Sequence, residues 1–407
     1  MRILFVHQNF PAQFVHLAPA LAERGHEVFG LTADTHKNPS RVPVARYKWQ
    51  PRQFDARTFG LAATFAEMTY RGQVVAAAAI ELRDKRALQP DIVFGSIGWG
   101  ETLFLREVWP DARHLLYAEL FYRPSGLDVG FDKEFSSTAI ASRIAVTARQ
   151  GHLLLAVNGA DRMLAPTRWQ ASTFPEDVRH RITVVHDGID TDRVRPADAA
   201  MVEIPGTGLR FRKGDELLTF INRNLEPHRG CHIFLRALPA VLEARPNAQV
   251  VIVGGNGRSY SPSPGPDKSW KQIFLDEVGN RLDMSRVHFV GQIPYATFVD
   301  LMRATRVHAY LTYPFVLSWS MLEAMSAGAL VIGSATPPVE EVIEDGINGR
   351  LVDFFDVPGW SAALIEALAE PERFDHLRQA ARRTVVERYD LRSICLPRLI
   401  EFVEQQG

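Results

Sequence analysis

Residues 313–334 read YPFVLSWSMLEAMSAGALVIGS, and this stretch decides the fold class. A loop comes first, a short helix is predicted to start near Ser318–Ser320, and Gly328 ends that helix. The apolar run Ala329–Gly333 then predicts a buried strand. A helix that leads directly into a short apolar strand is the repeating unit of a parallel sheet, so the stretch indicates an α/β protein.

The same alternation of apolar runs and amphipathic segments forms two sets along the chain. The strands predicted in the first set are Ile3–Val6, Glu27–Leu31, Asp91–Gly95, Leu115–Ala118, Met163–Ala165 and Ile182–Val185. Those predicted in the second set are Leu217–Asn222, Gln249–Gly254, Val287–Val290, Val307–Leu311 and Ala329–Gly333. Phe14–Arg24, ended by Gly25, predicts the first crossover helix. Two sets of βα units predict two Rossmann-like domains.

The stretch from Asp190 to Glu203 separates the two sets and has the composition of an interdomain linker. We therefore expect a first domain over 1–195, a second over 196–385 and a terminal helix within 386–407 that packs back toward the first domain. A chain of 407 residues is long enough for two hydrophobic cores.

Composition excludes several classes of partner. The formal net charge is -1, so no global field attracts nucleic acid. The two cysteines, Cys231 and Cys395, are far apart and in no zinc-ligand spacing, which fits a reducing cytoplasm. No run reaches the roughly 18 apolar residues of a membrane span. We expect a cytoplasmic protein. Peripheral association with the inner face of the membrane is compatible with this expectation.

The predicted helix near Ser318 carries the first candidate ligand contacts. Backbone N–H groups around Ser318 and Ser320, together with the helix dipole, suit a pyrophosphate. Glu323, one turn further on, has the two acceptor oxygens that a vicinal ribose diol requires. The spacing Ser320-x-x-Glu323 also fits a capping box, in which the glutamate only satisfies the helix start, and local pattern alone favours this second interpretation.

A basic cluster follows the first strand of the second set. Residues 220–230 read FINRNLEPHRG and place Arg223 and Arg229 just beyond the carboxyl end of that strand. Open α/β sheets bind ligands at this edge. Guanidinium groups there can neutralise a diphosphate leaving group.

These two clusters resemble the carboxyl-terminal half of retaining family-four glycosyltransferases of the GT-B fold (group 1). In that family a Gly-Arg-Leu segment and a later Lys-Gly bind the donor phosphates, and here Arg223 and Arg229-Gly230 keep the basic residues. The sequence Leu322–Met325, Leu-Glu-Ala-Met, reproduces the end of the Glu-x7-Glu motif, whose last glutamate holds the nucleotide ribose. The resemblance therefore implies that Glu323 contacts the donor.

Further matches occur in order along nearly the whole chain. His186–Asp190 resembles the segment that leads into the hinge, and Ala244–Gly257 resembles the donor-domain strand and glycine turn, which implies donor contacts at Gly254 and Asn256. Phe289–Ile293 resembles the segment whose backbone meets the base, which implies a contact near Ile293.

Two positions depart from the family pattern. Phe315 stands eight residues before Glu323, where relatives have the glutamate that contacts the sugar. The first strand–helix turn, Gln8–Phe14, has none of the paired glycines that relatives often use to approach the donor phosphate. Asn9 and Gln13 are candidates to replace them, and the alternative is that this loop faces the acceptor.

Glu119 is the candidate acceptor-orienting residue of the first half. It follows the strand predicted over Leu115–Ala118, at an edge where relatives often place a histidine. The alternative is a structural ion pair between Glu119 and Arg123, and the two interpretations carry equal weight.

The resemblance implies a specific activity. A sugar moves from a nucleotide diphosphate donor, UDP-sugar favoured, to an acceptor hydroxyl with retention, and the site needs no metal. Arg223, Arg229 and Glu119 carry the catalytic roles, and the two sheets face each other across a central cleft. The acceptor is a glycan, a lipid-linked molecule or a small molecule.

Rival functions stay open at this point. A dinucleotide-dependent oxidoreductase needs a Gly-x-Gly-x-x-Gly turn after the first strand, where residues 10–13 read FPAQ. Asp190-Thr191-Asp192 matches the Asp-x-Asp spacing of metal-dependent transferases, but it lies at the predicted hinge. A sugar-nucleotide epimerase of the same fold and a catalytically silent nucleotide-sugar-binding protein are the remaining alternatives.

Overall fold

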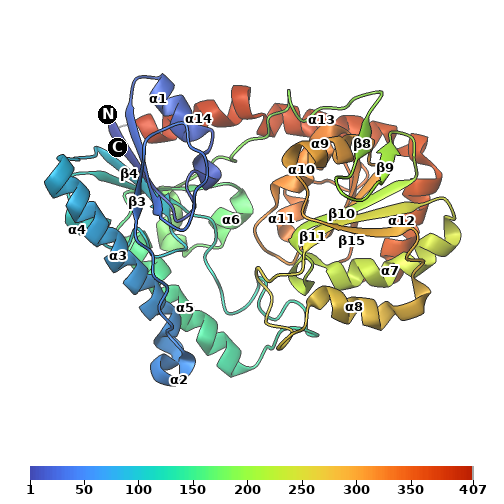
Figure 1. Cartoon of the computed structure of the whole chain (residues 1–407), viewed down its shortest axis with the longest axis horizontal. Helices are drawn as coiled ribbons and strands as arrows, with labels where there is room; N and C mark the ends of the chain where they lie inside the picture. Colours follow the sequence, from blue (N-terminus) through green and yellow to red (C-terminus); the bar gives the residue numbers. More distant parts are fainter. Residues whose placement is uncertain (406–407) are drawn as a thin grey trace. The chain divides into compact units, whose positions relative to one another are not determined.

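A computed structural model gives the positions of residues 1–405 (Figure 1). The chain forms two compact units. The first contains Met1–Val129, Ser137–Gly188 and the chain from Arg392 onward. The second contains Ile189–Leu391 together with a short excursion from the first half of the chain, Gly130–Ser136.

The first unit is built on a seven-stranded parallel sheet of order β3-β2-β1-β4-β5-β6-β7. Its strands are β1 (Arg2–Val6), β2 (Glu27–Ala33), β3 (Val44–Tyr47), β4 (Ile92–Ser96), β5 (Arg113–Tyr117), β6 (Arg162–Ala165) and β7 (Ile182–Val184). All six strands predicted in this half are confirmed. The sequence analysis missed β3, which pairs at the sheet edge and is only partly buried.

Helices cover both faces of this sheet. They are α1 (Leu17–Glu23), α2 (Ala56–Phe59), α3 (Ala63–Arg86), α4 (Leu105–Val108), α5 (Ile140–Asn158), α6 (Arg168–Ser172) and α14 (Leu396–Glu404). The terminal helix α14 buries Leu399, Phe402 and Val403 in the same core as α1. Glu404 in α14 also forms ion pairs with Arg24 and His26.

The second unit is built on a six-stranded parallel sheet of order β12-β11-β10-β13-β14-β15. Its strands are β10 (Leu217–Asn224), β11 (Gln249–Gly255), β12 (Val287–Gly291), β13 (Val307–Tyr310), β14 (Leu330–Ser334) and β15 (Arg350–Val352). The five strands predicted in this half are confirmed. The three-residue β15 and the antiparallel pair β8 (Met201–Glu203) and β9 (Arg210–Arg212) were not predicted.

Two separate cores lie on the faces of this second sheet. One contains residues of α7 (Cys231–Ala244), α8 (Trp270–Val278) and α12 (Val357–Ala369). The other contains residues of α9 (Tyr295–Ala304), α10 (Trp319–Ala327) and α13 (Asp375–Tyr389). The remaining helix is α11 (Pro337–Glu340). The two groups of helices lie on opposite sides of the sheet in Figure 1.

The predicted domain boundaries differ from the observed division. The linker prediction for Asp190–Glu203 is wrong, because the second unit begins at Ile189 and Val194 and Val202 are buried in its core. The chain returns to the first unit at Arg392 rather than at residue 386, and residues 406 and 407 of the predicted terminal segment lie outside the described part of the chain. The linker was predicted from the composition of Asp190–Glu203. The structure shows that buried residues of this segment belong to a core of the second unit.

Both sheets have the topology in which ligands bind beside the central strand. In the first unit the strand order reverses between β1 and β4, and in the second it reverses between β10 and β13. In sheets of this topology, ligands bind at the carboxyl edge beside the reversal point. The predicted basic cluster and the loop before α10 follow β10 and β13, so the fold brings them to one edge of the sheet.

Candidate functional site

Arg229 lies at the reversal point of the second sheet. It ends a short 3₁₀ turn, Pro227–Arg229, and its side chain is only 8% exposed. Its Nη1 donates to Thr312 Oγ1 at 2.7 Å. This bond joins the loop after β10 to the loop after β13. A guanidinium that is fixed in this way is preorganised to stabilise an anion that binds at this edge of the sheet.

Gly230 allows the chain to turn from this 3₁₀ segment into α7. Its φ is +70°, and a Cβ there would lie 2.3 Å from Leu311 Cβ. Both facts exclude an ordinary side chain. The Arg229-Gly230 pair is thus fixed by backbone geometry as well as by the hydrogen bond to Thr312.

Arg223 differs from Arg229 in its surroundings. It is the penultimate residue of β10 and is exposed to solvent. Gly254, near the end of the neighbouring strand β11, is buried, and a Cβ there would lie 2.9 Å from the carbonyl oxygen of Asn222. Asn256 follows in the exposed loop. Because β10 and β11 are adjacent and parallel, these residues occupy the same sheet edge as Arg229.

The start of α10 is already partly satisfied by the protein. Ser318 is the N-cap, and its Oγ accepts from the N–H of Ser320 at 3.4 Å. The N–H of Ser318 itself donates to the Tyr310 hydroxyl at 2.8 Å. A phosphate at this helix start would therefore compete with these bonds for the two N–H groups that the sequence analysis assigned to it.

Glu323 does not cap the helix. Its Oε1 accepts from the Tyr295 hydroxyl at 2.6 Å, and Ser318 rather than Ser320 is the N-cap, so the capping-box interpretation is wrong. Burial raises the pKa of Glu323, against the lowering effects of the Tyr295 hydrogen bond and the Arg193 charge. A buried carboxylate with one neutral donor keeps acceptor capacity for a diol.

Ile293 lies just beyond β12, at the same edge of the sheet. Its side chain is half-buried and packs against the core that contains α9 and α10. This position is on the same side of the sheet as Glu323. The predicted base contact near Ile293 and the predicted ribose contact at Glu323 thus occur on one side of the second unit.

Aromatic rings lie beside Arg229, and one of them is Phe315, the position at which the resemblance implied a glutamate. Phe315 is buried and packs edge-on against the His228 ring at 4.5 Å. The guanidinium carbon of Arg229 lies 5.5 Å from the centre of the Phe315 ring and 5.6 Å from that of Tyr260. Burial and the charge of Arg229 lower the pKa of His228 to about 3. His228 is consequently a neutral packing group at physiological pH.

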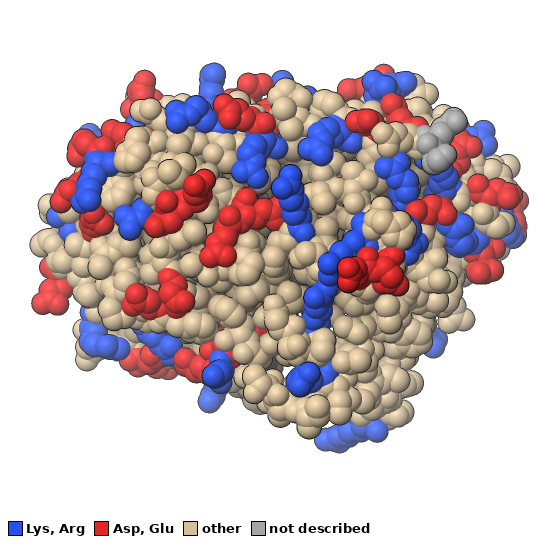
Figure 2. Space-filling model, turned by 180° about the vertical axis from the view of Figure 1, so that it is seen from behind, with Lys and Arg blue, Asp and Glu red and all other residues tan. Residues whose placement is uncertain are grey.

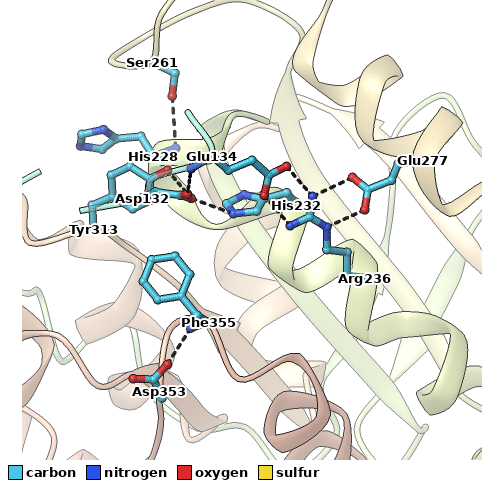
Figure 3. A network of polar contacts seen from close by, with 10 residues as sticks. All are labelled: Asp132, Glu134, His228, His232, Arg236, Ser261, Glu277, Tyr313, Asp353 and Phe355. Carbon is cyan, nitrogen blue, oxygen red and sulfur yellow. Dashed lines mark hydrogen bonds and ion pairs between the residues drawn. The ribbon is translucent and has the colours of Figure 1, made fainter. Parts of the chain in front are cut away.

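The Gly130–Ser136 excursion contacts Tyr313, whose ring packs on the His228 ring at 4.8 Å (Figure 3). Asp132 Oδ2 accepts from the Tyr313 hydroxyl at 2.7 Å and lies 3.0 Å from His232 Nε2. Burial raises the pKa of Asp132, but the bonds from His232 and Tyr313 outweigh it and hold the pKa below its ordinary value. Phe131 packs on the Tyr313 ring at 5.1 Å. A segment from the first half of the chain thereby fixes Tyr313.

The same excursion contains a candidate cation site. Within residues 1–405, ligand atoms of Asp132, Glu134 and His232 lie within 4.8 Å of one another. Arg236, however, donates to both carboxylate oxygens of Glu134, at 2.7 and 2.9 Å, and also pairs with Glu277 (Figure 3). The Glu134 carboxylate is thus already paired with a guanidinium, so it does not need a metal ion to balance its charge. The metal-independence of the predicted reaction stays a prediction.

Glu119 follows β5 in the first unit and is partly buried, and its backbone carbonyl accepts from Gln170 Nε2 at 2.6 Å. Arg123 donates instead to the backbone carbonyls of Ser172, Thr173 and Phe174. Its Nε and Nη2 are thus used to anchor residues 172–174. The role of Glu119 in orienting an acceptor stays a prediction.

A buried polar network that sequence reasoning missed lies at the reversal point of the first sheet. Glu101, after β4, is fully buried and accepts from the Tyr47 hydroxyl at 2.7 Å. Arg71 donates to the Gln8 side chain, at the start of the loop that lacks the paired glycines. Burial raises the pKa of Glu101 to about 7. The Gln8–Phe14 loop is therefore braced by side chains.

The two parallel sheets, each with a reversal point, define a two-domain α/β protein of the Rossmann-like class. Residues 24–194 match the family described as glycosyl transferase family 4 group, and residues 208–384 match glycosyl transferases group 1. The chain belongs to this family of GT-B-fold glycosyltransferases.

Curated relatives are similar to part of the chain. A D-inositol 3-phosphate glycosyltransferase of Streptomyces avermitilis is 27% identical over 235 residues, 56% of this chain and 48% of that protein. A phosphatidyl-myo-inositol mannosyltransferase of Mycolicibacterium smegmatis is 28% identical over 228 residues, 55% of this chain and 51% of that protein. The chain thus spans about half the length of the curated relatives it matches.

Solved structures show the same fold over the whole chain. Sucrose-phosphate synthase from Thermosynechococcus elongatus superposes with a TM-score of 0.73 at 18% identity and covers 99% of this chain and 98% of its own. HepE from Anabaena, solved in complex with UDP and glucose, superposes with a TM-score of 0.67 at 16% identity and covers 99% of each chain. Identities this low establish the two-domain architecture alone.

Charge and hydropathy of the described chain add two observations. On the face shown in Figure 2, basic and acidic side chains are interspersed, in keeping with the net charge of -1. None of the helices within residues 1–405 has the length and hydropathy needed to cross a membrane.

Proposed function

We propose that this protein transfers a sugar from a nucleotide diphosphate donor, UDP-sugar favoured, to an acceptor hydroxyl with retention and without a metal ion. The observation that carries the proposal is the buried guanidinium of Arg229, bonded to Thr312 at the β10–β13 reversal point. Family membership and the solved HepE complex with UDP support a uridine nucleotide as the ligand.

The donor would lie along the carboxyl edge of the second sheet. Its ribose would bind Glu323, its base would approach Ile293, and its diphosphate would meet Arg229 and the exposed Arg223. Gly254, Asn256, Ser318 and Ser320 complete the proposed donor contacts. Gly254 is the penultimate residue of β11, Asn256 directly follows that strand, and Ser318 and Ser320 lie at the start of α10.

The proposed reaction breaks the bond between the anomeric carbon and the terminal phosphate oxygen. The acceptor hydroxyl forms the new bond on the same face of the sugar, and its proton passes to the departing phosphate, so a nucleoside diphosphate leaves. Arg223 and Arg229 stabilise the charge that grows on the diphosphate. Glu119 is proposed to orient the acceptor.

Calorimetric titration with UDP tests the nucleotide site, and kinetics test its role. Arg223→Ala should lower turnover roughly tenfold or more, because it removes a charge that stabilises the leaving group. The exposed Arg383 in α13 provides a control, and Arg383→Ala should leave turnover unchanged. Equal turnover for wild type and Arg223→Ala would refute the proposed role.

Product analysis separates the proposal from its rivals. Proton NMR of the product's anomeric signal shows whether configuration is retained, and an epimerase would release an altered nucleotide sugar without an acceptor. Full activity in the presence of a strong chelator supports the metal-free reaction. Strict dependence on magnesium would contradict it.

A further inference from the structure

One buried carboxylate ties the loop after β11 to the turn that contains Arg229. Glu226 is 1% exposed, and its carboxylate accepts from the N–H groups of Ser259, Tyr260 and Ser261 at 3.1–3.2 Å. Ser261 Oγ also accepts from the His228 N–H at 3.1 Å (Figure 3). Charge-assisted bonds to consecutive backbone donors hold a loop more firmly than neutral bonds do. The backbone at Tyr260 is therefore fixed relative to Arg229.

Tyr260 is nevertheless an exposed aromatic side chain. It is 43% exposed, although its ring packs on Phe315 at 4.6 Å and on His228 at 5.4 Å. Both of these neighbours are buried. The backbone of Tyr260 is hydrogen-bonded and part of its ring is packed against other rings. Binding of a ligand over Tyr260 would therefore cost little conformational entropy of the protein. Such rigid, half-exposed rings are typical walls of ligand sites.

The position of Tyr260 separates it from the nucleoside end of the proposed donor. Glu323 is bonded to Tyr295 of α9, and both α9 and α10 belong to the core on one face of the second sheet. Tyr260 contacts His228, which lies in the 3₁₀ turn before α7 and packs on Tyr313, a residue of the core on the other face. A diphosphate at Arg229 would thus have its ribose toward α10 and its sugar toward α7.

We propose that Tyr260 is a specificity-determining residue that forms an aromatic wall against the sugar ring of the donor. This rests on the proposed function, since it takes Arg229 as the diphosphate contact. The class of ligand is a hexopyranose joined to a nucleoside diphosphate, which presents a patch of C–H groups to the ring. With Phe315 in place of a carboxylate, Tyr260 and Phe315 together give this wall an apolar character.

The test compares each nucleotide sugar with its own nucleoside diphosphate. UDP, GDP, UDP-glucose, UDP-galactose, UDP-N-acetylglucosamine and GDP-mannose are titrated calorimetrically into the full chain, and the nucleotide sugar that binds most tightly is used further. For Tyr260→Ala, the ratio of the Kd of that nucleotide sugar to the Kd of its nucleoside diphosphate should rise roughly threefold to tenfold. Tyr260→Phe should have the same ratio of the two Kd values as the wild type, because stacking requires the ring and not the hydroxyl.

Each contrary result has a defined meaning. An unchanged ratio in Tyr260→Ala, with the affinity for the nucleoside diphosphate lowered, would show that the ring contacts the base and would overturn the proposal. Unchanged affinities for both ligands would overturn it as well. If the wild type bound none of the six ligands, the proposed function itself would fail. Thermal unfolding provides the control. If both variants have the same unfolding midpoint as the wild type, the affinities compared are those of folded proteins.

Discussion

Replacement of the buried Glu101 by glutamine should remove one contribution to stability that weakens as pH rises. The folded-state pKa of Glu101 is about 7, whereas its ordinary value is 4.5, because burial opposes the charged form. The folded state therefore holds the proton more tightly than the unfolded state. The stabilisation that results is complete below the ordinary pKa and is lost as pH rises through the folded-state pKa.

The magnitude follows from these two values. Each pKa unit corresponds to about 1.4 kcal/mol, so the full loss between acid and alkaline pH is about 3 kcal/mol. Between about pH 5.5 and about pH 8 the linkage relation gives a loss of about 2 kcal/mol. Glu101→Gln keeps the shape of the side chain and removes the titration. Its free energy of unfolding relative to wild type should therefore rise by about 2 kcal/mol over this range.

The measurement must report on the first unit alone. Hydrogen–deuterium exchange of peptides that contain β1 and β4, followed at increasing denaturant concentration, gives the opening free energy of that unit at each pH. The control is Glu107→Gln, which changes an exposed carboxylate six residues further on. The reasoning would be refuted if the difference in opening free energy between Glu101→Gln and the wild type did not vary with pH, or varied in the opposite direction.

Three further predictions concern the second unit. The pKa of Glu323 lies above its ordinary value, so UDP affinity measured by calorimetry should fall as pH is lowered toward that pKa, and Glu323→Gln should bind UDP more weakly without this dependence. An unvarying wild-type affinity would contradict the ribose contact. Gly230→Ala should cost roughly 2 kcal/mol or more in denaturant titrations, because φ is +70° and its Cβ would collide with Leu311. If Gly230→Ala were as stable as the wild type, the turn would have to adjust to the added methyl group, contrary to this prediction. Asp132→Ala should cost about 2 kcal/mol near neutral pH by leaving the buried Tyr313 hydroxyl without its acceptor. The pKa of Asp132 is held low, so in the wild type this stabilisation is present above the ordinary carboxyl pKa and should be lost only in acid.

Local sequence was sufficient for the regular elements and for the edge where the ligand site lies. Eleven predicted strands appear in the structure, and they were recognised because each is a short, largely apolar run that alternates with an amphipathic segment. The edge strand β3 and the three-residue β15 were missed, since partly buried residues give a weak periodic signal. Arg223 and Arg229 were located because both follow a predicted strand.

The partners of the site residues could not be predicted. Glu226 bonds to a loop more than thirty residues further on, and no pattern within either segment marks the pairing. The choice between a cap and a ligand contact for Glu323 depended on Tyr295, which lies on another helix. Tyr260 and the Glu101 network carried no sequence signal for the same reason.

By itself, the sequence determined that this protein is an α/β chain of two Rossmann-like halves with a basic cluster after the first strand of the second half. Hydrophobic periodicity and glycine stops are local properties, so they can be recognised along the chain. Tertiary structure alone decided that Gly130–Ser136 packs in the second unit and that Arg229 is buried against Thr312. It also decided that Phe315 and Tyr260 stand together beside that arginine. These are contacts between residues distant in sequence, and only the packing of whole elements fixes them.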